Sequence, residues 1–121
     1  MVLIDDLKNT FIEEYEGVLD EMLKFRFKNA TILLSKSLFA VCDLLIYTKT
    51  ENLPKNHSER FKILKEYFPK IYCIFDSIWS EYVDSYSKPS NKEICEKIKN
   101  AIKKIREIEN LPEEIKKIID K

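Results

Sequence analysis

The sequence contains a single glycine, no glutamine and one histidine in 121 residues. One glycine is too few for the tight turns of a sheet-rich protein or for a glycine-rich phosphate-binding loop. One histidine, in a chain with no Cys-x-x-Cys pair, cannot complete a Cys2His2 zinc site. We therefore expect no resident metal and no cofactor.

Cysteine is scarce as well, and the pattern of its use argues against disulfides. The chain has three cysteines, an odd number, widely separated and each within an apolar-patterned segment. We expect reduced core residues of a cytoplasmic protein, at Cys42, Cys73 and Cys95.

Neither a secretory leader nor a membrane span is indicated. The first ten residues, MVLIDDLKNT, carry acids where a signal peptide needs bases. The longest apolar stretch, around residues 38–47, is interrupted by Asp43 and is too short to cross a bilayer. We expect a cytoplasmic location and no membrane partner.

An excess of either charge is also missing, because 21 basic residues balance 21 acidic ones. No global attraction to nucleic acid or to an anionic membrane follows, and any such binding would need a local patch. The hydrophobic fraction of 45% excludes disorder, and the length predicts one domain spanning residues 1–121.

What the sequence does contain is helical periodicity along most of its length. Apolar residues spaced three or four apart predict a first helix of about six turns with a buried stripe, formed by Ile4, Leu7, Phe11, Tyr15, Val18, Met22 and Phe25. No segment alternates with period two. We predict an all-α, up-and-down bundle of about five helices.

The second segment, NATILLSKSLFAVCDLLIYTK at residues 29–49, is apolar on nearly every side, which predicts a central helix. Asn29, Lys36 and Asp43 recur every seven residues and form a narrow polar seam. Either this seam faces solvent, or its charges pair with another helix or a second subunit.

Capping signals divide the rest of the chain. Asn56 followed by Glu59 is a variant of the capping box and predicts a helix start. Pro69 predicts the first turn of the next helix, and Ser90 is positioned as the N-cap of another. Residues 110–121 are typical of a short helix or a kinked continuation.

The lone histidine, His57, falls at the first helical position after Asn56, where the helix dipole disfavours its protonation. A neutral imidazole could act as a base, but no nucleophile or orienting partner is indicated nearby. We assign no catalytic residue. The candidate polar site, predicted to make contacts between helices or subunits, consists of Lys36, Asp43, His57, Arg60, Asp84 and Tyr86.

Three stretches in order give the chain a resemblance to a known superfamily. They are KFRFKNATILLSKSLFAVCDLLIYTK, then LPKNHSERF, then EYVDSYSKPSNKEICEKIKNAIKKI. Over residues 20–108 the chain resembles the HEPN superfamily (higher eukaryotes and prokaryotes nucleotide-binding). The resemblance implies an up-and-down bundle that is commonly a dimer and is often encoded with a nucleotidyltransferase, in a toxin–antitoxin-like context. Surplus aromatics in the fourth helical segment also favour a dimer.

Many members of that superfamily are endoribonucleases that use an arginine, a gap of four to six residues, and a histidine. Here the residues in place of that arginine are Thr50, Glu51 and Asn52, and the stretch WSEYVDSY carries neither Arg nor His. The favoured function is therefore a non-catalytic module that dimerises or binds a partner. A nucleotide or RNA is a further candidate ligand, which the balanced charge does not support. The alternatives are a divergent, metal-independent endoribonuclease built from the Lys36–Asp43 seam, His57 and Arg60, and a structural bundle without a ligand.

Overall fold

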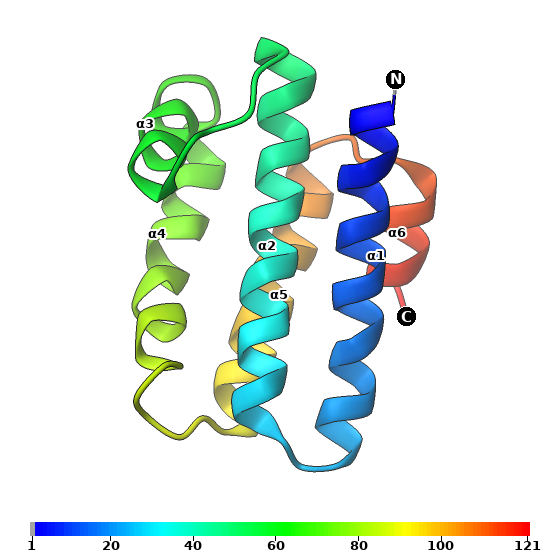
Figure 1. Cartoon of the computed structure of the whole chain (residues 1–121), viewed down its shortest axis with the longest axis vertical. Helices are drawn as coiled ribbons and strands as arrows, with labels where there is room; N and C mark the ends of the chain where they lie inside the picture. The colour runs from blue at the N-terminus through cyan, green and yellow to red at the C-terminus, as the bar shows by residue number, and fades with distance from the viewer. Residues whose placement is uncertain (1) are drawn as a thin grey trace.

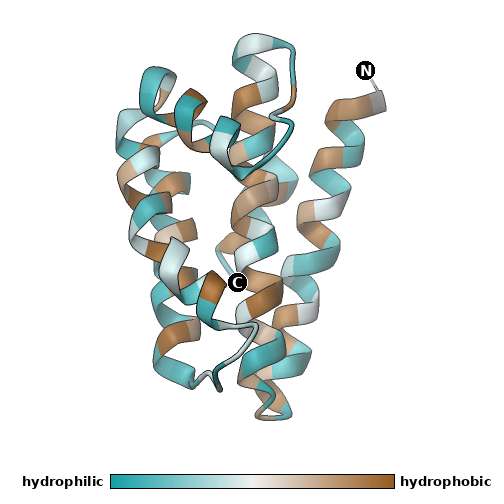
Figure 2. Cartoon of the chain, turned by 60° about the vertical axis from the view of Figure 1, so that its left-hand side comes forward, coloured by the Kyte–Doolittle hydropathy of each residue, from teal (hydrophilic) through white to brown (hydrophobic). Residues whose placement is uncertain are grey.

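A computed structural model describes residues 2–121, and these residues form six helices and no strand (Figure 1). The helices are α1 (Val2–Leu23), α2 (Phe27–Thr50), α3 (His57–Tyr67), α4 (Pro69–Asp84), α5 (Lys92–Ile108) and α6 (Glu113–Ile119). The predicted helical class is confirmed, with six helices in place of about five. Figure 2 shows apolar and hydrophilic residues interleaved along the helices that face the viewer, as amphipathic packing requires.

The central helix is α2, as its all-round apolar pattern predicted. It packs against α1, α3, α4 and α5, while α6 packs against α1 and α5. All six helices contribute to one hydrophobic core, for example through Phe11, Leu34, Leu64, Phe75, Ile98 and Ile115. The core thus lies along the whole length of α2.

The segment after α5 forms a separate helix because the chain leaves the helical conformation before Pro112. Glu109 is extended (φ −116°, ψ 149°), and Pro112, at the N-cap of α6, has no N–H to donate. Leu111, between them, is buried and anchors the connection to the core.

One predicted cap is confirmed and one is wrong. Asn56 is the N-cap of α3, and its side chain accepts a hydrogen bond from the Glu59 N–H. The N-cap of α5 is Asn91 and not Ser90, because the Asn91 side chain accepts from the Ile94 N–H. The Ser90 hydroxyl instead shares a hydrogen bond with the Thr31 hydroxyl on α2.

Two residues predicted to be buried are exposed. The stripe on α1 ends with the helix at Leu23, so Phe25 lies in the turn before α2 with 79% of its surface exposed. Cys42 and Cys95 are core residues as predicted, but Cys73 lies on the exposed side of α4. All three thiols are free.

By length and composition, α2 could cross a membrane, a property that the short apolar stretch at residues 38–47 did not suggest. However, 67% of its most apolar window is buried within the bundle. A core helix of a soluble protein meets the same criteria, so this property assigns no location.

Candidate functional site

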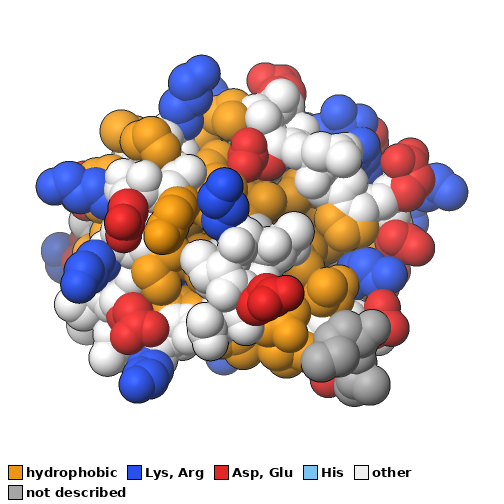
Figure 3. Space-filling model, turned by 90° about the horizontal axis from the view of Figure 1, so that it is seen from above, with side chains coloured by type: hydrophobic (Ala, Val, Ile, Leu, Met, Phe, Trp, Pro, Cys, Tyr) orange, Lys and Arg blue, Asp and Glu red, His pale blue; other side chains and the backbone are white. Residues whose placement is uncertain are grey.

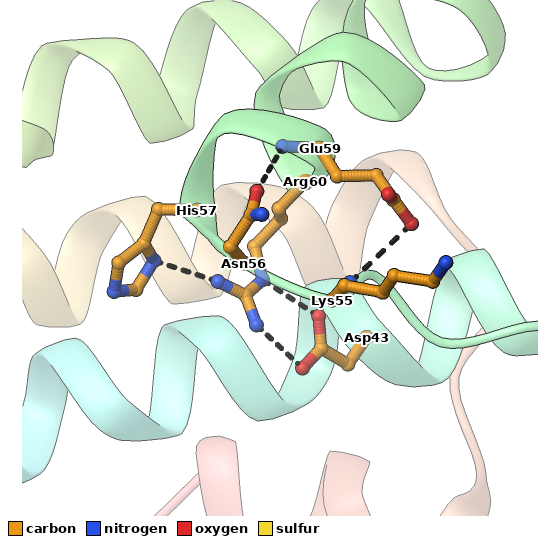
Figure 4. Close-up of polar contacts among 6 residues, drawn as sticks. All are labelled: Asp43, Lys55, Asn56, His57, Glu59 and Arg60. Carbon is orange, nitrogen blue, oxygen red and sulfur yellow. Dashed lines mark hydrogen bonds and ion pairs between the residues drawn. The ribbon is translucent and has the colours of Figure 1, made fainter.

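The first turn of α3 holds the candidate site in place. The Asn56 carboxamide accepts from the Glu59 N–H at 2.8 Å, and the Glu59 carboxylate accepts from the Lys55 N–H at 3.3 Å (Figure 4). This is a capping box displaced by one residue, since Glu59 reaches Lys55 and not Asn56. The cap fixes where α3 begins and places His57 and Arg60 one turn apart on the side that faces α2.

Arg60 joins α3 to α2 through a two-pronged ion pair. Its Nε donates to Asp43 Oδ1 at 2.7 Å and its Nη2 donates to Asp43 Oδ2 at 2.9 Å. The pair is largely shielded from water, with side-chain exposures of 11% for Arg60 and 17% for Asp43. Such charge-assisted, bidentate bonds are the strong ones, and shielding makes the loss of either partner expensive.

The third guanidinium nitrogen fixes the protonation of His57. Arg60 Nη1 lies 2.7 Å from His57 Nδ1, and because arginine only donates, Nδ1 must accept (Figure 4). The imidazole is therefore neutral and carries its proton on Nε2. All three nitrogens of Arg60 are thus engaged within the chain.

Aromatic rings enclose this cluster. The His57 ring lies 5.0 Å from Phe39 and 4.7 Å from Trp79, and the Arg60 guanidinium lies 5.4 Å from the centre of Phe39. Burial lowers the pKa of His57, and the positive charge of Arg60 lowers it further, against the smaller opposing effect of Asp43. The helix dipole predicted the direction of this pKa shift correctly, but burial and the charge of Arg60 are its main causes.

A pair of tyrosines extends the cluster along α4. The Tyr82 and Tyr86 hydroxyls share a hydrogen bond at 2.5 Å, and the Tyr82 ring lies 5.9 Å from that of His57. Burial and this hydrogen bond raise the pKa of Tyr82 to about 12. Tyr86 is therefore linked to the cluster through Tyr82, whereas 65% of its own surface is exposed.

Two of the six predicted site residues lie elsewhere. Lys36 is exposed on α2, and its charge acts on Glu14 of α1, where it opposes the rise that burial causes in the pKa of that carboxyl. Asp84 forms an exposed ion pair with Lys88 at 3.6 Å. The seam is therefore divided: Lys36 belongs to a solvent-facing strip, while Asp43 pairs with another helix.

Sequence reasoning missed the aromatic wall of the site. Phe39 precedes Asp43 by one turn of α2, and Trp79 and Tyr82 are one turn apart on α4, so their spacing was a usable signal. These rings pack on one another and on His57, which uses up within the chain much of the aromatic surplus that favoured a dimer.

The geometry limits the chemistry that the cluster can perform. A general base needs a free lone pair, but the Nδ1 lone pair of His57 accepts from Arg60 and Nε2 is protonated. Within residues 2–121 no three His, Cys, Asp or Glu side chains are placed to hold a metal ion. Burial raises the pKa of the Cys42 thiol, so this residue is no ready nucleophile.

No model of a known protein family, no curated protein and no solved structure matches this chain.

Proposed function

We propose that the protein is a non-catalytic, HEPN-like up-and-down bundle that dimerises or binds a protein partner. The observation that carries this proposal is that the side chains of the polar cluster bond to one another. Arg60 donates to Asp43 and His57 through all three of its nitrogens, and His57 keeps no free lone pair. This cluster joins α2 to α3 and fixes the position of one helix relative to the other.

A groove at one end of the bundle supports the binding role. It has a volume of about 490 Å³ and lies between the end of α2, the α3–α4 junction and the end of α5. Tyr67 and Ile108, which are 46% and 41% exposed, line it together with Lys49 and Lys70. Figure 3 shows this end of the bundle, where apolar side chains are interspersed with charges of both signs.

The partner that we propose is a second copy of the chain or a protein of the nucleotidyltransferase type, the second following only from the resemblance. The test is light scattering of the purified protein, with affinity purification from the native host, for the wild type and for Tyr67→Asp/Ile108→Asp. We expect a dimer or a stoichiometric partner that the variant loses. Val83→Asp, at a 47% exposed position of α4 outside the groove, is the control. A monomer that recovers no stoichiometric protein would contradict the proposal.

The endoribonuclease alternative has one observation in its favour, the convergence of Asp43, His57 and Arg60 at a single place. Incubation of concentrated protein with total RNA separates the two functions. We expect intact RNA from the wild type and from His57→Gln alike. Cleavage by the wild type that is lost in a folded His57→Gln variant would instead assign the enzyme.

A further inference from the structure

The turn between α1 and α2 forms one pole of the bundle (Figure 1). Residues 23–28, Leu-Lys-Phe-Arg-Phe-Lys, alternate apolar and basic side chains across this turn. Leu23 and Phe25 are each 79% exposed, more than any other large apolar side chain among the residues whose burial is described. We call residues 23–28 the tip.

The backbone of the tip holds Phe25 in a conformation that is unfavourable for a residue with a side chain. Phe25 has a φ of 59°, the left-handed conformation that usually requires glycine at the end of a helix. The turn itself is well formed, because the Arg26 N–H donates to the Glu21 carbonyl at 2.9 Å. Apart from an edge-to-face contact with Phe27, the Phe25 ring gains nothing from folding, so fold stability does not explain a bulky aromatic here.

The cations of the tip have no internal partners. Lys24, Arg26 and Lys28 are exposed, and none forms an ion pair within the described part of the chain, which is also true of most of its other basic residues. The first turn of α2 contains no acidic residue. Asp20 and Glu21 lie in the last turn of α1 beside these three cations, so residues 20–28 together carry one excess positive charge on a chain of zero net charge.

In contrast to the expectation of no membrane partner, we propose that the tip docks the protein onto an anionic lipid bilayer, with Leu23 and Phe25 entering the interface and Lys24, Arg26 and Lys28 against the lipid phosphates. Apolar side chains flanked by unpaired cations are complementary to a negatively charged, apolar-centred surface. A single-stranded nucleic acid fits less well, because it is bound in a groove with several stacking rings, and here Leu23 cannot stack. The bundle would stand on its end, which leaves the groove at the opposite pole accessible.

Vesicle flotation tests the proposal with vesicles of phosphatidylcholine alone and with phosphatidylglycerol added to about one third. We expect the wild type to float only with the anionic vesicles. Lys24→Gln/Arg26→Gln/Lys28→Gln should weaken partitioning about a hundredfold, since each basic residue near the surface contributes roughly fivefold.

A second variant, Leu23→Ser/Phe25→Gly, separates docking from folding. Glycine relieves the left-handed strain at position 25, so this variant should melt no lower than the wild type and yet lose the vesicles. Two matched controls at other exposed sites, Leu53→Ser/Val83→Ser and Lys103→Gln/Lys104→Gln, should float like the wild type.

Four results would overturn the proposal. The first two are a wild type that does not float with anionic vesicles and tip variants that float as well as the controls. Another is binding of a labelled oligouridine, lost in the tip variants, without vesicle binding, which would assign the tip to nucleic acid. The fourth is a dimer that Leu23→Ser/Phe25→Gly converts to a monomer in the absence of lipid, which would assign the tip to a second copy.

Discussion

Replacing Asp43 with alanine should destabilise the protein strongly, because it leaves a shielded positive charge without its partner. Arg60 would keep its contact with His57 but lose both carboxylate bonds, at 2.7 and 2.9 Å, while only 11% of its side chain reaches water. Breaking one side of such a pair costs about 3 kcal/mol. For a chain of this length that corresponds to a fall in melting temperature of roughly 12 °C. Urea denaturation monitored by circular dichroism measures the free energy of unfolding.

The chain offers a matched control for this experiment. Arg106 donates to Asp120 through the same two nitrogens, at 3.0 and 2.9 Å, but this pair is open to solvent. Asp120→Ala should therefore change the free energy of unfolding by no resolvable amount, because water and salt screen an exposed pair. Equal effects of Asp43→Ala and Asp120→Ala would refute the reasoning, since the two pairs differ mainly in burial.

Three further measurements follow from the structure. The free energy of unfolding should fall as the pH drops below about 6.5, because His57 takes up a proton in the unfolded chain but has a lowered pKa in the folded protein. Urea titrations at several pH values measure this dependence, and His57→Gln should flatten it. Gly17→Ala should raise the free energy of unfolding by up to about 1 kcal/mol in the same assay, because alanine favours the helix more than glycine does. The new methyl would lie 3.3 Å from Cδ1 of the half-buried Leu33, so this gain requires a small shift of the Leu33 side chain. A loss of stability would mean that Leu33 cannot shift. A thiol reagent should label one cysteine, Cys73, in the native protein and three in urea; fast labelling of a second native thiol would contradict the burial of the other two.

The helical architecture was predictable because each helix buries a stripe that the sequence displays directly. The turn at Lys24–Arg26 was not, because it contains neither glycine nor proline and the apolar spacing continues through it to Phe25. Only the structure shows that Phe25 adopts the left-handed conformation and leaves the core. A local backbone reversal of this kind has no periodic signature.

The candidate site was predictable in part. The seven-residue recurrence of Lys36 and Asp43 and the cap at Asn56 identified the polar residues of α2 and the start of α3 correctly. Which seam residue would meet Arg60 could not be predicted, because it depends on where α3 crosses α2. Lys36 and Asp43 share one face of α2, but they lie two turns apart and only Asp43 pairs with Arg60.

The most direct test of the claim that the cluster of Asp43, His57 and Arg60 is not catalytic is to determine the tautomer of His57. Nitrogen NMR of the imidazole distinguishes a protonated ring nitrogen from one that accepts a hydrogen bond. At about pH 7 we predict a neutral ring with the proton on Nε2 and with Nδ1 accepting from Arg60, which leaves no base for catalysis. A proton on Nδ1, or an imidazolium at that pH, would show that Nδ1 does not accept from Arg60 and would contradict the non-catalytic assignment.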